Sequence, residues 1–196
     1  MTEGISIVLI TYNKGATLRK SLEHIYRHRD AFREVVLVDN GSSDRTFEMV
    51  RREFPNVEVS RLEKNVGVPA GRNVGAAKAR CDLLFFYDDD GRFDFSALPA
   101  VIELLRTRDE IAVATFEVVN LPADDIFALE MAAYRTAHRE SRYVPVFKGG
   151  ASIIKRDVFI KVGMYPDYFF YCREENDLSY RLFRNGYRII HCGNAV

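Results

Sequence analysis

The sequence has few cysteines, no excess of charge of either sign and no long apolar run. Cys81, Cys172 and Cys192 are widely spaced, which excludes a disulfide framework or a zinc spacing and fits a reducing compartment. Lysine and arginine total 28, as do aspartate and glutamate, so composition gives no electrostatic case for a nucleic acid partner. No apolar run is long enough to span a bilayer.

The two ends of the sequence bear on where we expect the protein to act. The N-terminus passes from Met1 into a strand-like run without a signal peptide, so we expect a cytoplasmic protein. Membrane contact is expected only peripherally, at the inner face, or through a segment beyond Val196. Because the sequence stops shortly after a strand-like run, we expect the chain to be truncated at its C-terminal end.

Apolar runs alternate with segments of helical spacing over the first 116 residues. Strands are expected over residues 5–10, 35–38, 57–62, 83–87 and 111–116. Asp44 and Ser96 are the expected N-caps of two intervening helices. The pattern predicts an α/β fold with a doubly wound, mostly parallel mixed sheet whose polar strand ends share one edge.

The alternation breaks after Val118, although the length still predicts a single domain over 1–196. A partly helical segment is expected over 124–140, followed by a strand over 146–154 that Gly149 and Gly150 interrupt. A further helix is expected to begin at Glu174 and to end at Gly186, before a last strand over 188–191.

Three consecutive carboxylates, those of Asp88, Asp89 and Asp90, follow the buried run 83–87. Adjacent carboxylates repel one another, so a cation or several hydrogen-bond donors must compensate them. Hard oxygen ligands suit Mg²⁺ or Mn²⁺, and Mg²⁺ takes one or two protein carboxylates and leaves other positions to phosphates and water. The trio predicts a metal-dependent site for a phosphate-bearing substrate, and the alternative is a solvated acidic turn that caps the next helix.

Two other strands also end in polar residues. Thr11, Tyr12 and Asn13 can contact a nucleobase, although an ordinary strand-to-helix turn is the simpler explanation of these residues taken alone. Asp39 can accept a hydrogen bond from a base N–H or a ribose hydroxyl, as acids at this place do in dinucleotide-binding folds, or it can cap a helix.

Gly71 and Arg72 lie beside an expected helix start. Free N–H groups there can bind an anion, and Arg72 can pair with phosphate oxygens; the alternative is a packing helix with an exposed arginine. The first strand lacks a glycine-rich turn and no Gly-Lys-Ser/Thr motif occurs, which excludes the dinucleotide fingerprint and the P-loop.

Glu174, Glu175 and Asp177 crowd the start of the expected helix at 174. Acidic residues in a first helical turn are favoured by the helix dipole, and this is the simpler explanation. The functional alternative is a general base that faces the metal across a cleft and takes a proton from an acceptor hydroxyl.

Together these segments resemble the family 2 glycosyltransferases, which have the GT-A fold. The resemblance lies in residues 6–13, 36–44, 65–67, 70–75, 88–90, 149–151, 162–165 and 174–181. It implies inverting transfer of a sugar from a UDP, GDP or dTDP sugar to a saccharide or lipid-linked acceptor, assisted by Mg²⁺ or Mn²⁺. The implied donor contacts are Thr11, Tyr12, Asn13, Asp39, Gly71, Arg72, Asp88, Asp89 and Gly150, and the implied metal ligands are Asp90 and Asp88.

The resemblance also assigns the later part of the chain. Residues 1–117 would bind the nucleotide sugar and residues 118–196 would carry the acceptor side, with 118–147 as a lid. Glu175 falls where the family places its catalytic base, which is usually an aspartate, so the choice between Glu174 and Glu175 stays open. The alternatives are a catalytically silent nucleotide-sugar-binding module, an inactive fragment or a sugar nucleotidyltransferase; the last would need a glycine-rich basic turn, of which 12–15 is a poor version.

Overall fold

The computed structural model describes residues 2–118 and 140–193, and the expected helix over 124–140 and most of the expected lid lie outside them. Its strands are β1 (Thr2–Thr11), β2 (Glu34–Asp39), β3 (Glu58–Arg61), β4 (Cys81–Asp88), β5 (Ile111–Thr115), β6 (Arg142–Tyr143), β7 (Ala151–Lys155) and β8 (Arg188–His191). Its α-helices are α1 (Gly15–Tyr26), α2 (Thr46–Glu53), α3 (Val68–Lys78), α4 (Leu98–Thr107), α6 (Arg156–Lys161) and α7 (Glu174–Arg184). Short 3₁₀ turns occupy Arg29–Ala31 and Phe95–Ala97.

The described strands form one mixed sheet in the order β3-β2-β1-β4-β7-β5-β8-β6. Neighbouring strands from β3 to β4 are parallel, as are β5 and β8, whereas β7 runs antiparallel to both β4 and β5. The predicted mostly parallel mixed α/β sheet is therefore confirmed. Because β5 is antiparallel to β7, it points the same way as β4, so β1, β2, β4, β5 and β8 all end at one edge.

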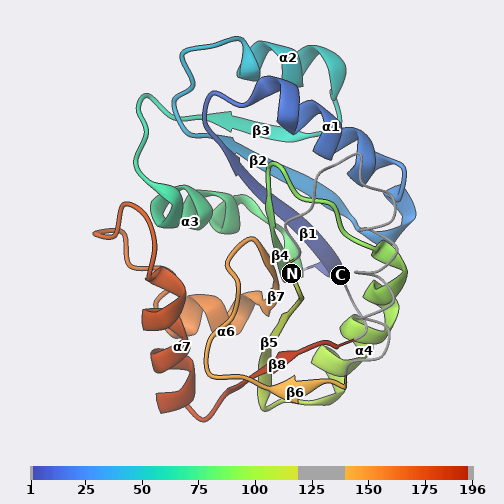
Figure 1. The fold of residues 1–196 in the computed structure, drawn as a ribbon, viewed down its shortest axis with the longest axis vertical. Coiled ribbons are helices and arrows are strands. Elements are labelled where there is room, and N and C mark those ends of the chain that lie inside the picture. Colours follow the sequence, from blue (N-terminus) through green and yellow to red (C-terminus); the bar gives the residue numbers. More distant parts are fainter. Residues whose placement is uncertain (1, 119–139, 194–196) are drawn as a thin grey trace.

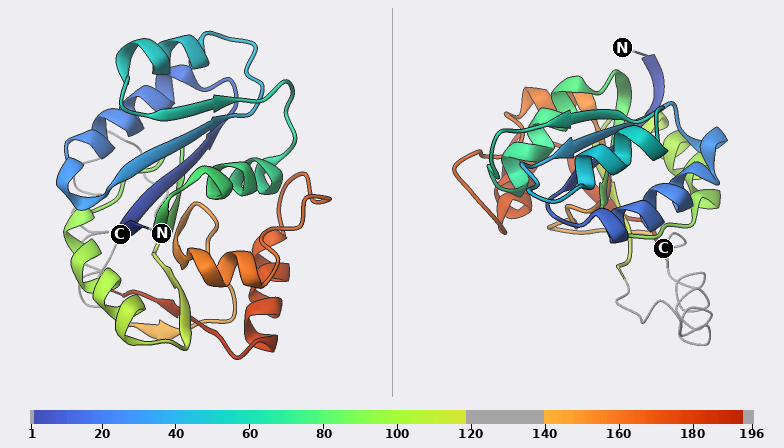
Figure 2. Two further views of the ribbon diagram at one scale, coloured as in Figure 1. Left: turned by 180° about the vertical axis from the view of Figure 1, so that it is seen from behind. Right: turned by 90° about the horizontal axis from the view of Figure 1, so that it is seen from above.

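Helices cover both faces of this sheet, with α1 and α4 on one side and α3, α6 and α7 on the other (Figures 1 and 2). Alternate residues of one strand divide between the two layers, since successive side chains point to opposite faces. Phe85 of β4 packs with Leu18, Leu22 and Leu105 of the first layer. Leu84 and Phe86 pack with α3, α6 and α7, so β4 is buried on both faces, as its apolar run predicts.

Three local expectations are wrong. The strand expected over 146–154 begins only at Ala151, and residues 146–150 form a loop before it. Asp44 is not the N-cap residue of α2, which is Arg45, although its carboxylate accepts from the amide of Thr46, the first residue of that helix, at 2.9 Å. Ser96 is not an N-cap either: Asp94 accepts from the Ser96 amide, and α4 begins at Leu98.

A charged network ties the amino-terminal part of the sheet together. The Glu34 carboxylate, at the start of β2, accepts from Ser6 Oγ at 2.6 Å and from the Arg80 amide at 2.6 Å. Burial opposes ionisation of Glu34, but these hydrogen bonds and the Arg80 guanidinium outweigh it and hold the pKa of Glu34 below its ordinary value.

None of the helices within residues 2–118 and 140–193 combines the length and the hydrophobicity of a membrane-spanning segment.

We predict that Glu34→Gln lowers the free energy of unfolding by about 1–3 kcal/mol at neutral pH. Because the folded pKa is depressed, the loss is fully present above the unfolded pKa of about 4.3 and disappears as pH falls through the folded pKa. Urea unfolding at pH 7 and pH 3 measures the difference, with Glu58→Gln as an exposed control near the same arginine. A difference that persists unchanged at pH 3 would contradict this assignment.

Candidate active site

Three polar residues meet at the carboxyl edge because their strands are paired in register. Thr11 ends β1 and pairs with Asp39 at the end of β2, and Ile10 pairs with Asp88 at the end of β4. Ligands of open α/β sheets bind outside such strand ends. The topology therefore brings together most of the residues predicted from separate segments of the sequence.

Asp89 and Asp90 share one cationic partner. Thr11 Oγ1 donates to Asp89 Oδ2 at 2.7 Å, and Lys14 Nζ lies 3.1 Å from both Asp89 Oδ1 and Asp90 Oδ2. Asp89 is buried, and burial raises its pKa above the ordinary value, although the hydrogen bonds from Thr11 and Lys14 act in the opposite direction. The Asp90 side chain is 55% exposed, so its carboxylate stays accessible to solvent and ligands.

Asp39 presents a buried oxygen with no hydrogen-bond partner among the described residues. Its Oδ1 accepts from the Ser42 amide at 3.0 Å, whereas Oδ2 lies 3.6 Å from Arg61 Nε, beyond hydrogen-bonding distance. Asp39 is fully buried. Because buried polar groups are almost always paired, an N–H or O–H group of a ligand is a natural partner for Oδ2.

Asn13 has a structural role at this edge. Its side-chain Oδ1 accepts from the backbone amide of Ser43 at 2.8 Å and from that of Asp44 at 3.3 Å. The backbone amide of Asn13 donates to Ser42 Oγ. Asn13 adopts a left-handed conformation with φ 54°, which asparagine tolerates. It joins the loop after β1 to the loop after β2, while the neighbouring Tyr12 side chain is exposed at the surface.

Arg72 is buried beneath the site, which rules out the exposed-arginine alternative. Its Nη2 lies 3.2 Å from Asp88 Oδ1, and its Nη1 lies 3.3 Å from Glu174 Oε1 and 3.2 Å from Glu175 Oε1. Only 6% of the residue is exposed. One guanidinium thus connects the end of β4 with the start of α7.

The two glutamates of this cluster differ in their surroundings. Glu174 is 2% exposed, its Oε2 has no hydrogen-bond partner among the described residues, and burial raises its pKa above the ordinary value. The Glu175 side chain is 18% exposed. Of the two, Glu175 has the carboxylate that a ligand can reach more readily.

Glycines allow the backbone to approach these carboxylates closely. A Cβ on Gly149 would lie 1.9 Å from Glu175 Oε1, and a Cβ on Gly150 would lie 1.9 Å from Asp88 Cγ. The loop 148–150 therefore lies directly against the cluster. Gly71 is different: a Cβ there would lie 1.9 Å from Ile10 Cδ1, so this glycine lets α3 pack on β1.

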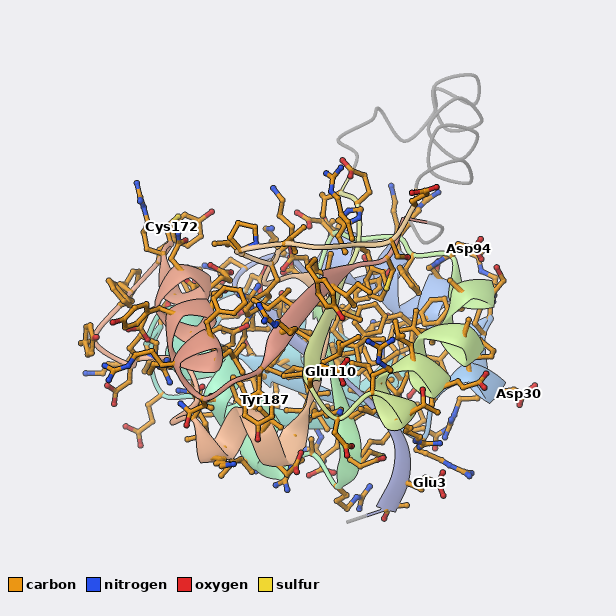
Figure 3. The ribbon with its side chains drawn as sticks, turned by 90° about the horizontal axis from the view of Figure 1, so that it is seen from below. Glu3, Asp30, Asp94, Glu110, Cys172 and Tyr187 are labelled. Carbon is orange, nitrogen blue, oxygen red and sulfur yellow. The ribbon has the colours of Figure 1, made fainter. Side chains whose placement is uncertain are left out.

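The loop before α7 lies beside α3, where the Val68 amide donates to the Phe170 carbonyl at 3.0 Å (Figure 1). Cys172 lies at the surface of this loop, on the opposite side of the molecule from Asp94 (Figure 3).

His191 ends β8 at the sheet edge where β4 ends, but β8 lies three strand positions from β4, which corresponds to roughly 14 Å. Its Nε2 is 3.3 Å from Glu117 Oε2, and it lines a cavity of about 390 Å³ with Glu140, Ser141 and Arg142.

The sequence analysis did not identify Lys14 and Arg61 as partners of the site carboxylates, or Asn40 as the residue that fixes the loop before α3. Asn40 Nδ2 donates to Asn65 Oδ1 at 2.8 Å, and its Oδ1 accepts from the Val66 amide, which fixes the approach to α3. Lys14 was visible as the basic residue directly after a polar strand end. Arg61 gave no local signal, because only the β2–β3 register brings it to Asp39.

The residues at this edge fit a divalent cation that is shared with a substrate. No group of three His, Cys, Asp or Glu side chains that could enclose a metal occurs in residues 2–118 and 140–193. Asp88 and Asp90 nevertheless present exposed carboxylates beside the strand ends. Mg²⁺ commonly takes one or two protein carboxylates and completes its shell with phosphates and water, so this donor set suits it.

Comparison with known proteins gives the family. The family described as Glycosyl transferase family 2 matches residues 6–163, which is most of the chain. The chain belongs to glycosyl transferase family 2. An uncharacterized glycosyltransferase of Bacillus subtilis, YwdF, is 29% identical over 185 residues, which cover 88% of this chain and 68% of the relative.

Solved structures of glycosyltransferases share the fold of this family 2 chain. Staphylococcus aureus TarS 1–349 in complex with UDP-GlcNAc superposes with a TM-score of 0.75 at 18% identity, covering 98% of this chain and 56% of TarS. A Pyrobaculum calidifontis mannosyltransferase in complex with GDP-Man and Mn²⁺ gives 0.70 at 20% identity, covering 96% and 55%. The GT-A fold is thus confirmed, and this chain spans little more than half of either protein.

Arg72 is the shared cation of the Asp88, Glu174 and Glu175 carboxylates. We predict that Arg72→Met lowers the free energy of unfolding by about 3 kcal/mol or more. The substitution leaves the buried Glu174 carboxylate without its cation. Adding Glu174→Gln removes that charge and should recover part of the loss. Urea unfolding tests both variants, with the exposed Arg52→Met as control; equal stability of Arg72→Met and the wild type would contradict this role.

Proposed function

We propose that this family 2 glycosyltransferase transfers a sugar, with inversion, from a nucleoside diphosphate sugar to the hydroxyl of a saccharide or lipid-linked acceptor. The observation that carries the proposal is the Arg72 contact, which joins Asp88 at the nucleotide-side strand ends to Glu175 at the start of α7. A donor-side carboxylate and a candidate base are thereby held against the same guanidinium. An inverting transfer needs the base on the face of the reacting carbon opposite the departing diphosphate.

The donor half of the proposal is residues 1–117. The Oδ2 of Asp39, which forms an ion pair with Arg61 but has no hydrogen-bond partner among the described residues, would accept from a base or ribose group, and the exposed Tyr12 ring would lie against the base. Thr11 and Asn13 would act mainly by fixing the loops around that ligand. The TarS and P. calidifontis complexes, which hold UDP-GlcNAc and GDP-Man, support a nucleotide-sugar donor.

Asp90 and Asp88 would hold the divalent cation together with the donor diphosphate. A cation bound there stabilises the negative charge that develops on a departing diphosphate. Mn²⁺ in the mannosyltransferase complex supports a divalent metal, and the exposure of Asp90 leaves room for phosphate oxygens and water in its shell.

Residues 118–196 form the acceptor half in this proposal, with Glu175 as the general base. Its carboxylate takes the proton from the acceptor hydroxyl while that oxygen forms a bond to the anomeric carbon. The bond between that carbon and the phosphate oxygen breaks on the opposite face, and the nucleoside diphosphate leaves. The buried Glu174 would fix Arg72, and the 148–150 loop would lie between donor and acceptor.

We predict that Glu175→Gln lowers turnover at least about 100-fold while leaving nucleoside diphosphate affinity within about twofold, because a general base acts only on the acceptor proton. The assay follows release of nucleoside diphosphate from UDP-GlcNAc, UDP-glucose, GDP-mannose and dTDP-glucose, with a mixture of short oligosaccharides as acceptors. Glu23→Gln, on the exposed face of α1, is the matched control.

Two results would contradict parts of this proposal. Unchanged turnover in Glu175→Gln would remove the base assignment and direct attention to Glu174. A wild-type protein that binds a nucleoside diphosphate but turns over none of the donors would favour a catalytically silent nucleotide-sugar-binding module.

A further inference from the structure

The two acidic groups of the site each have a cation built into the chain, but the two cations differ in accessibility. Arg72 is buried among Asp88, Glu174 and Glu175 and has little access to solvent. The Lys14 side chain is 47% exposed and lies over Asp89 and Asp90. The first pairing is fixed by the fold. Lys14, by contrast, pairs with the buried Asp89 and, at the surface, with the exposed Asp90, and exposed ion pairs such as the one with Asp90 are weak and exchange readily.

The backbone holds Lys14 in place for this contact. Asn13 is pinned to the loop after β2 by its hydrogen bonds to Ser43 and Asp44, and Lys14 follows it as the N-cap residue of α1. The Lys14 side chain makes no capping hydrogen bond. Its ammonium group instead reaches the two carboxylates, with equal distances of 3.1 Å to one oxygen of each.

Lys14 is also the hydrogen-bonding partner of the Asp90 carboxylate in the described part of the chain. An ammonium group is a compact point charge that can pair with a carboxylate or with a phosphate. A divalent ion that engages Asp90 must therefore share the carboxylate with Lys14 or displace it. A diphosphate arriving with that ion brings new negative charge to the place where the displaced ammonium group lies.

We propose that Lys14 is a positioning residue that neutralises Asp89 and Asp90 in the donor-free protein and moves to the donor diphosphate when the divalent ion binds. This inference rests on the proposed function, because it takes the metal and the diphosphate from there. Lys14 opposes binding of the metal alone and favours binding of the diphosphate with metal. The same substitution must therefore change the two affinities in opposite directions.

The test compares Lys14→Met with the wild type in two binding experiments that need neither acceptor nor turnover. The first measures Mn²⁺ affinity without nucleotide, from the electron paramagnetic resonance signal of free Mn²⁺. Loss of an exposed ion pair should tighten Mn²⁺ binding about two- to fivefold. The second measures UDP and GDP affinity at saturating Mn²⁺ by calorimetry, and loss of a phosphate contact should weaken binding about fivefold or more.

Two control variants separate this role from a general charge effect. Lys20→Met removes the same charge from the exposed face of α1 and should change neither affinity. Lys14→Arg keeps the charge and should stay close to the wild type in the Mn²⁺ experiment. Thermal unfolding of each variant confirms that the fold is retained.

The outcomes also separate this inference from the proposed function. Wild-type protein that binds a nucleoside diphosphate with Mn²⁺, while Lys14→Met changes both affinities in the same direction or neither, overturns the role of Lys14 alone. Wild-type protein that binds no nucleoside diphosphate with Mn²⁺ overturns the proposed donor site and this inference with it.

Discussion

The site depends on one buried guanidinium that three carboxylates share. Arg72 enters from α3, Asp88 from β4 and Glu174 and Glu175 from α7, so the contact links segments about 100 residues apart in the sequence. Three carboxylates in one place, that of Glu174 almost fully buried, are unstable without a cation. Arg72 supplies that cation through the fold itself. Asp90 lies outside this cluster, is exposed and pairs with Lys14, so a ligand-borne cation can reach it.

The sheet topology explains why the other functional residues converge. Parallel pairing of β1 with β2 and β4 brings Thr11, Asp39 and Asp88 to one edge. The antiparallel strand β7 then enters beside β4, and the loop before it brings Gly149 and Gly150 against Asp88 and Glu175. A Cβ at either position would force the side chains of Asp88, Glu175 or Arg72 to move, so the glycine pair permits the close approach of loop and carboxylates.

The main strands and the polar edge could be predicted from the sequence because their signals are local. A doubly buried strand such as 83–87 is continuously apolar, and its polar end identifies the edge where ligands bind. The burial of Arg72 could not be predicted, since its glutamate partners are more than 100 residues away and only the packing of α7 brings them close. The late start of β7 was missed because apolar residues before Gly149 look like a strand, whereas Val146 is exposed in a loop and Phe147 is buried without being in a strand.

The most direct test of the donor site is calorimetric titration of the protein with UDP, GDP and dTDP, each with and without Mn²⁺. The site described here predicts that at least one of these diphosphates binds, that binding requires the metal, and that Asp90→Ala abolishes it. Binding that is equally strong without metal would contradict the role of Asp90, and no binding to any of the three would contradict the nucleotide-sugar site itself.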